Sequence, residues 1–185
     1  ILTNNKKLYS KIKILRSHGI VKNFKQPWKY KIDELGYNYR LTDIQSALGI
    51  TQLKKLNKFI KRRKEIAKIY NQKFKNIKYF EIPQKISNTS HSYHLYPLKI
   101  NFNHLKINKD TLLKKLRNKG INLQVHYIPI YYHNLYKSKI KSNFPNAENF
   151  FKKAVSLPIY FTLKNREIQY IIKTLLKIVF SNLKK

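Results

Sequence analysis

The 185-residue sequence contains no cysteine, no methionine and only eight acidic side chains. Without cysteine, the chain can form neither a disulfide nor a thiolate metal site, and it has no cysteine nucleophile. Lysines interrupt even the longest apolar runs, such as Ile168–Phe180, so no segment is predicted to span a bilayer. The first residues lack the pattern of a signal peptide. Because 42% of the residues are hydrophobic, we expect a soluble, cytoplasmic globular chain.

The scarcity of acids leaves a net charge of +32, for which there are two explanations. A nucleic acid or an anionic membrane would bind such a chain through its phosphates. Alternatively, AT-rich codons enrich lysine on every solvated face without selecting a partner. The lysines extend from Lys6 to Lys185, and only six of the forty basic residues are arginine. The sequence therefore favours codon bias and predicts no specific nucleic acid and no membrane partner, with a basic, non-catalytic binding module as the alternative.

Helical and strand patterns follow one another along the first 80 residues. Residues 1–5 are predicted to end a strand, and residues 6–15 to form a helix that Gly19 stops. Residues 21–35 are typical of a loop. Thr42 and Gln45 form a capping box at the start of a helix. A second, basic helix is predicted over 58–74, with Ile66, Ile69 and Tyr70 inward and Lys61, Arg62, Arg63 and Lys64 in solvent.

A polar stretch within residues 75–88 indicates a domain boundary, after which a compact α/β layer is predicted. We expect the following elements in chain order: a strand at 93–100, a helix at 110–119, a strand at 121–126, a tyrosine-rich loop at 127–139, a helix at 147–155 and a final helix at 165–183. The final helix is predicted to bury Ile168, Ile171, Ile172, Leu175 and Ile178.

The stretch Gly36–Gly49 places an amide and a guanidinium directly before a helix. Asn38 and Arg40 lie on a loop that precedes a helix N-terminus, where anions are favoured. This arrangement suits half of a phosphate site. In the alternative, purely structural interpretation, Asn38 fills a turn and Arg40 pairs with Asp33, Glu34 or Asp43.

A second polar cluster ends the strand predicted at 121–126. Gln124, His126 and Tyr127 lie at this strand end, a common ligand position in α/β layers, and Pro129 fixes the loop that follows. A single histidine at such a position is also compatible with a structural role. His91 and His94 have no suitable further ligands, so the sequence predicts no metal site.

Four segments resemble the DegT/DnrJ/EryC1/StrS family of sugar aminotransferases: LRSHGI at 15–20, ELGYNYRLTDIQSALGITQLKKL at 34–56, HLYPL at 94–98 and QVHYIPIYYHNLY at 124–136. The resemblance implies an α/β chain of the aspartate-aminotransferase type, which is fold type I of the enzymes that use pyridoxal 5′-phosphate. It covers the C-terminal half of a family member. Residues 1–80 would hold the end of the large cofactor-binding domain and its connecting helices, and residues 81–185 the small domain.

The resemblance also implies an activity and roles for single residues. The complete enzyme would pass an amino group, with glutamate as the expected donor, to a 4-keto UDP-sugar in cell-surface sugar synthesis of the pseudaminic acid type. Asn38 would reach the cofactor phosphate or the substrate of the partner subunit in a homodimer with shared active sites, and Arg40 would support that loop. Gln124, Val125, His126 and Tyr127 would lie along the nucleotide-sugar.

One family feature has no counterpart among these residues. The lysine that forms the Schiff base with the cofactor lies upstream of the segment matched by residues 1–5, so we expect no catalytic residue in this chain and no activity from it alone. The chain starts without methionine, and we expect an upstream sequence with a Ser-x-x-x-Lys-like segment. A family member without that lysine would be a dehydratase, which these residues leave open.

Overall fold

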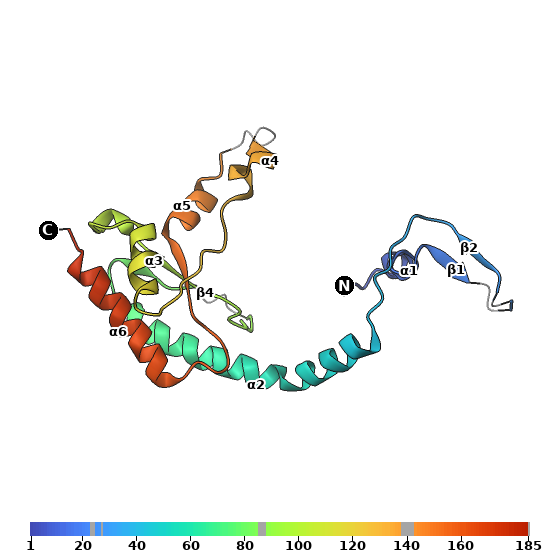
Figure 1. Cartoon of the computed structure of the whole chain (residues 1–185), viewed down its shortest axis with the longest axis horizontal. Helices are drawn as coiled ribbons and strands as arrows, with labels where there is room; N and C mark the ends of the chain where they lie inside the picture. Colours follow the sequence, from blue (N-terminus) through green and yellow to red (C-terminus); the bar gives the residue numbers. More distant parts are fainter. Residues whose placement is uncertain (23–24, 27, 85–87, 138–142, 185) are drawn as a thin grey trace. The chain divides into compact units, whose positions relative to one another are not determined.

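The computed structural model describes residues 1–22, 25–26, 28–84, 88–137 and 143–184. These residues form two compact units, Ile1–Lys55 and Leu56–Lys185, and the division falls inside the long helix α2 (Asp43–Phe74; Figure 1). The boundary expected within 75–88 therefore lies downstream of the structural division, because the end of α2 is buried in the core of the second unit. Whether residues 1–80 and 81–185 belong to different domains of a longer enzyme stays a prediction.

The first unit begins with a helix and a small hairpin. Helix α1 (Lys6–Leu15) has the predicted bounds, and the side chain of Asn5 caps it by accepting a hydrogen bond from the backbone N–H of Leu8. The strand expected at residues 1–5 is wrong, since these residues lead into the cap. The stretch interpreted as a loop contains β1 (Ile20–Lys22) and β2 (Tyr30–Ile32), which pair antiparallel.

Two glycines allow the residues after α1 to pair with residues 36–39. Backbone hydrogen bonds join Tyr37 to both Leu15 and His18, at 2.7 and 2.9 Å. A Cβ atom on Gly36 would lie 2.1 Å from the backbone nitrogen of Gly19, and one on Gly19 would lie 1.8 Å from the carbonyl oxygen of Glu34. Only hydrogen at both positions permits this approach.

The predicted capping box begins α2. The backbone N–H of Thr42 donates to Gln45 Oε1 at 2.9 Å, and the backbone N–H of Gln45 donates to Thr42 Oγ1 at 3.3 Å. The sequence predicted separate helices before and after residue 57, whereas the structure has one helix of 32 residues. The residues around the expected break include neither proline nor glycine, so nothing there interrupts the backbone hydrogen bonds.

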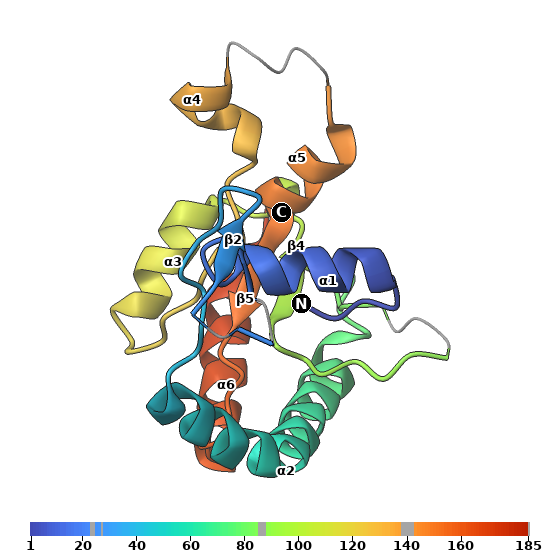
Figure 2. The same cartoon turned by 90° about the vertical axis from the view of Figure 1, so that its right-hand side faces the viewer.

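The second unit contains a three-stranded antiparallel sheet in the order β3 (Phe80–Glu81), β4 (Tyr96–Ile100) and β5 (Ala154–Leu157). The other elements of this unit are η1 (Phe102–His104), α3 (Lys109–Arg117), η2 (Ile130–Tyr132), α4 (Asn134–Lys137), α5 (Pro145–Lys153) and α6 (Asn165–Ser181). The α/β class is confirmed, and Figure 2 shows β4, β5 and the helices α3, α5 and α6 from a second side.

Three expected elements of this unit differ from the structure. The loop expected at 127–139 contains η2 and α4 in its described part. The strand expected at 121–126 is reduced to a single bridge between Gln124 and Ser156. The helix expected to reach residue 155 ends at Lys153, because the next four residues, Ala154–Leu157, are all buried as a sheet strand. Burial between neighbours thus outweighs helical spacing there.

The core of the second unit is apolar and unites the end of α2 with α3, α6 and the sheet. From α6 it includes Ile168, Ile171, Ile172 and Leu175, as predicted, while Val179 takes the fully buried position expected for Ile178. From α2 it includes Ile66 and Tyr70, as expected, and Ile69 is half-buried. Within the described residues, no helix has both the length and the apolar character needed to cross a membrane.

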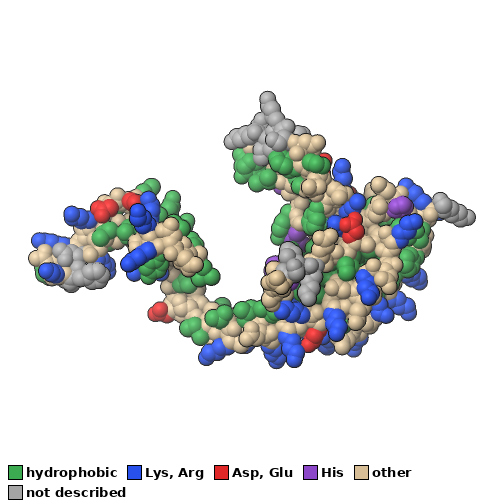
Figure 3. All heavy atoms as spheres, turned by 180° about the vertical axis from the view of Figure 1, so that it is seen from behind, with side chains coloured by type: hydrophobic (Ala, Val, Ile, Leu, Met, Phe, Trp, Pro, Cys, Tyr) green, Lys and Arg blue, Asp and Glu red, His purple; other side chains and the backbone are tan. Residues whose placement is uncertain are grey.

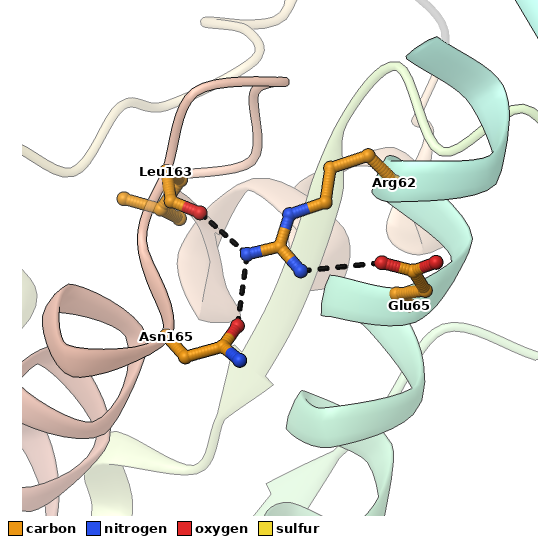
Figure 4. Close-up of polar contacts among 4 residues, drawn as sticks. All are labelled: Arg62, Glu65, Leu163 and Asn165. Carbon is orange, nitrogen blue, oxygen red and sulfur yellow. Dashed lines mark hydrogen bonds and ion pairs between the residues drawn. The ribbon is translucent and has the colours of Figure 1, made fainter. Parts of the chain in front are cut away.

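Two arginines of α2, which were predicted to face solvent, bind backbone carbonyls instead. Arg62 donates to the carbonyl oxygen of Leu163 at 2.6 Å and to Asn165 Oδ1 at 2.9 Å, and it pairs with Glu65 (Figure 4). Arg63 donates to the carbonyl oxygens of Tyr93, His94 and Ile159 at 2.9–3.1 Å. The guanidinium carries enough donors to satisfy several carbonyls at once, which helical spacing alone does not reveal. Lys61 and Lys64 are exposed, as predicted.

Candidate functional site

Asn38 and Arg40 lie together at the end of the glycine-dependent pairing in the first unit. Arg40 Nε donates to Asn38 Oδ1 at 3.2 Å, and an Nη of Arg40 lies 3.2 Å from Nε2 of His18. Ser17 and Asn38 form a backbone bridge, which fixes the segment that carries Asn38. Arg40 thus contacts an amide and an imidazole, whereas Glu34, one of the alternative partners, pairs with Lys11 at 3.2 Å.

His18 is a member of this cluster that the sequence interpretation missed. It adopts a left-handed backbone conformation, with φ of 62°, next to Gly19. The signal was present in the LRSHG segment, because a histidine directly before a glycine that stops a helix is placed in the turn. The turn brings its ring to Arg40, 22 residues away in the sequence.

This polar cluster presents hydrogen-bond donors to solvent. The amide oxygen of Asn38 accepts from Arg40, so its NH₂ group remains to donate, and Arg40 retains further N–H groups. A surface cavity of about 460 Å³ beside it is lined by the cationic side chains Lys13, Arg16, Lys22 and Arg40. An anion with several acceptor oxygens, such as a phosphate, suits this arrangement.

The residues from Gln124 to Tyr127 lie in the second unit, beside strand β5. Gln124 exchanges two backbone hydrogen bonds with Ser156, at 2.7 and 3.2 Å. The imidazole Nδ1 of His126 lies 2.8 Å from Oγ of Ser156. Val125 is half-buried, whereas Tyr127 is 75% exposed and meets the ring of His126 edge to face. This segment therefore combines a fixed histidine with an accessible aromatic side chain.

The two predicted groups of site residues belong to different units. Asn38 and Arg40 are part of the first unit, and Gln124, Val125, His126 and Tyr127 are part of the second. The structure brings the members of each group together and adds one residue to each, namely His18 and Ser156. The roles of all these residues in binding stay predictions.

Burial raises the pKa of the two tyrosines that anchor α2 to the sheet. The hydroxyl of Tyr70 donates to the carbonyl oxygen of Pro158 at 2.9 Å, and that of Tyr96 donates to Asn71 Oδ1 at 2.6 Å. Desolvation is the largest cause of the raised pKa of both groups, and neighbouring tyrosines add to it. Both phenols therefore stay protonated as donors and act in packing.

Comparison with solved structures identifies the class of protein that this fold represents. The aminotransferase PseC of Helicobacter pylori, described as involved in the biosynthesis of pseudoaminic acid, matches with a TM-score of 0.88 and 35% identity over 97% of this chain and 48% of its own. The putative sugar aminotransferase Spr1654 of Streptococcus pneumoniae, in its PMP form, matches with a TM-score of 0.86 and 27% identity over 97% of this chain and 46% of its own. The fold is that of the pyridoxal-phosphate-dependent sugar aminotransferases.

The family follows from the sequence. Residues 1–176 match the model of the DegT/DnrJ/EryC1/StrS aminotransferase family, and the chain belongs to that family. The UDP-4-amino-4,6-dideoxy-N-acetyl-beta-L-altrosamine transaminase of Campylobacter jejuni (strain 81-176) is 40% identical over 97% of this chain and 47% of its own length. Its namesake from H. pylori is 35% identical over 96% of this chain. The chain thus spans about half the length of the curated relatives that it matches.

Solved forms of a relative indicate the cofactor. Spr1654 is known in a PLP form and a PMP form, so pyridoxal 5′-phosphate is the cofactor indicated for the family. The donor-rich cluster of Asn38 and Arg40 fits the phosphate group of this cofactor in charge and in hydrogen-bonding character.

Proposed function

We propose that this chain is the C-terminal half of an aminotransferase that passes an amino group to a 4-keto nucleotide-sugar in pseudaminic acid-type synthesis. The observation that carries the proposal is the 40% identity to the C. jejuni transaminase over 97% of this chain. Glutamate is the proposed amino donor. When bound, pyridoxal phosphate supplies the electron sink for transamination, and we place the lysine that holds it upstream of Ile1.

The residues of this chain would bind and orient the reactants. Asn38 donates its amide N–H to a phosphate oxygen of the cofactor or substrate, and Arg40 holds the amide oxygen so that the NH₂ group faces outward. Gln124 and Val125 form an edge along the nucleotide-sugar, because the backbone of Gln124 is fixed by its bridge to Ser156 of β5. His126 donates to an oxygen of the nucleotide-sugar, and the exposed ring of Tyr127 covers the nucleotide-sugar.

A homodimer with shared active sites is part of this proposal. The first half of α2 exposes apolar side chains that a soluble chain ordinarily covers: Ile44 is 83%, Leu48 is 59% and Leu53 is 68% exposed. These residues follow Asn38 and Arg40 closely in the chain. A partner that covers this face would therefore lie close to the donor cluster, which supports placing Asn38 at the active site of the other subunit.

A chimera tests the proposal without knowledge of the upstream sequence. The N-terminal half of the C. jejuni transaminase is fused to residues 1–185 at the position matched by Ile1. We expect the chimera to retain pyridoxal phosphate and to aminate the 4-keto UDP-sugar with glutamate, because this chain supplies the missing binding residues. The N-terminal half alone serves as control. A folded, dimeric chimera that loads the cofactor but does not transfer the amino group would contradict the proposal.

Mixed dimers of the chimera test whether Asn38 acts across the interface. Changing Asn38 to alanine removes a hydrogen bond to a charged group, which is worth about 1.5–3 kcal/mol, and we expect weaker cofactor retention. Combining an Asn38→Ala subunit with a subunit that lacks the Schiff-base lysine should restore part of the activity, because one site then holds neither defect. Asn57→Ala, an exposed change in α2, is the matched control. Heterodimers that form yet stay inactive would show that Asn38 serves its own subunit.

A further inference from the structure

Ser156 stands apart chemically from the core around it. Among the described residues, it is the one polar or charged residue in the buried class, with 7% of its surface exposed. It lies in β5 between Val155 and Leu157, which are 0% and 3% exposed. Burying a hydroxyl without a hydrogen-bond partner costs free energy of folding, so a buried serine is expected to have a partner. The identity of that partner indicates the role of the serine.

The partner of Ser156 is the imidazole of His126. Oγ of Ser156 lies 2.8 Å from Nδ1 of His126, and the backbone of Ser156 exchanges two hydrogen bonds with Gln124. One strand residue thus fixes both the main chain at 124 and the ring at 126. The two residues directly after the strand are held as well, since the hydroxyl of Tyr70 and the guanidinium of Arg63 bind the carbonyls of Pro158 and Ile159.

The hydrogen-bonding capacity of the two groups determines the direction of this bond. A serine hydroxyl has one proton to donate, and within the described residues His126 is its side-chain partner. If Nδ1 carried the proton and donated to Oγ, the buried hydroxyl proton would have no acceptor in the part of the chain that the structure describes. With Nδ1 unprotonated, Ser156 donates to it, and the neutral ring carries its proton on Nε2.

The geometry points to Ser156 as a positioning residue that holds His126 in the neutral tautomer with the proton on Nε2. The ring then offers a fixed N–H donor to an oxygen of the nucleotide-sugar. The part played by the nucleotide-sugar rests on the proposed function, whereas the tautomer does not. His126 contacts the substrate under this scheme, and Ser156 acts only through His126.

The tautomer can be measured directly on the 185-residue chain. Two-bond ¹H–¹⁵N correlation spectra of the histidine rings at neutral pH should show Nε2 protonated in His126. The change Ser156→Ala should convert this single form to a mixture, and Ser156→Thr, which keeps the hydroxyl, should restore it. Ser10→Ala, on an exposed face of α1, is the matched control. Protonation of Nδ1 in the unaltered chain would overturn the inference, and so would an unchanged tautomer in a folded Ser156→Ala chain.

A kinetic measurement in the chimera carries the inference to the substrate. Loss of one oriented hydrogen bond should raise KM for the UDP-sugar by about three- to tenfold in the Ser156→Ala chimera, with KM for glutamate unchanged and with rescue by Ser156→Thr. An equal rise of both KM values would overturn the positioning role. An inactive chimera with Ser156 in place would instead contradict the proposed function, while the spectra would still decide the tautomer.

Discussion

Replacing Gly36 with alanine is expected to disrupt the pairing that holds Asn38 and Arg40. The added Cβ would lie 2.1 Å from the backbone nitrogen of Gly19, 2.5 Å from the carbonyl carbon of His18 and 2.8 Å from the carbonyl oxygen of Leu15. Because these atoms belong to the backbone, no side-chain rotation relieves the clash. We expect a loss of about 3 kcal/mol or more in the stability of the first unit, measured by hydrogen exchange of its backbone amides.

Gly49 provides a matched control for this change. It lies within α2, and a Cβ built on it meets no atom within 4 Å. Gly49→Ala should therefore raise stability by about 0.5–1 kcal/mol, because alanine favours helix. Equal amide protection in the Gly36→Ala and Gly49→Ala chains would show that the close approach of residues 15–19 and 34–36 does not hold the first unit together.

Replacing Arg63 with methionine is expected to destabilise the second unit strongly. The guanidinium binds three carbonyl oxygens, two before β4 and one after β5, and methionine leaves all of them without this donor. Hydrogen bonds to charged groups are individually strong, so we expect a loss of about 3 kcal/mol in the free energy of unfolding. Urea denaturation followed by tyrosine fluorescence would measure it.

Lys61→Met is the control for Arg63→Met, because it removes one positive charge from an exposed position of the same helix. We expect a change within about 0.5 kcal/mol for this surface substitution. If the two variants unfolded at the same urea concentration, the bonds of Arg63 would contribute nothing beyond its charge. A loss of unfolding free energy in Arg63→Met alone would confirm that the hydrogen bonds of Arg63 stabilise the contact of α2 with the residues that flank β4 and β5.

Local chemistry predicted several elements well. The pattern of residues 6–15 predicted α1 at its observed bounds, and Thr42 with Gln45 predicted the start of α2. The apolar positions of α6 predicted its buried face, apart from the exchange of Ile178 for Val179. Each of these features depends on residues within a few positions of one another, so the sequence carries the whole signal.

Features that depend on distant residues could not be predicted in the same way. β5 replaces the end of a predicted helix because β4 lies beside it. Arg62 and Arg63 leave solvent because the carbonyls of Leu163 and Ile159, which lie 101 and 96 residues further along the chain, come within reach. His18 and Ser156 join the candidate site through contacts 22 and 30 residues apart. The pattern along the chain places His18 in a turn, but it contains no local trace of the contacts themselves.

Codon bias, with no specific nucleic-acid partner, stays the prediction for the charge of the chain. On the face drawn in Figure 3, Lys and Arg side chains are scattered over both units. This distribution fits lysine enrichment across the whole sequence better than one built polyanion surface. The candidate site contains a few donors in fixed positions, among them Asn38 and Arg40.

The central claim is that residues 1–185 bind the nucleotide-sugar. The most direct measurement of it is a single turnover of the chimera with the amino sugar that appears in the name of the C. jejuni transaminase. The chimera, loaded with pyridoxal phosphate, is mixed with UDP-4-amino-4,6-dideoxy-N-acetyl-beta-L-altrosamine in the absence of any keto acid. If residues 1–185 bind the nucleotide-sugar as proposed, the absorbance band of the pyridoxal form should fall and that of the pyridoxamine form should rise. A chimera that makes this change with glutamate but not with the sugar would contradict the account, because this chain would then complete the cofactor site without recognising the substrate.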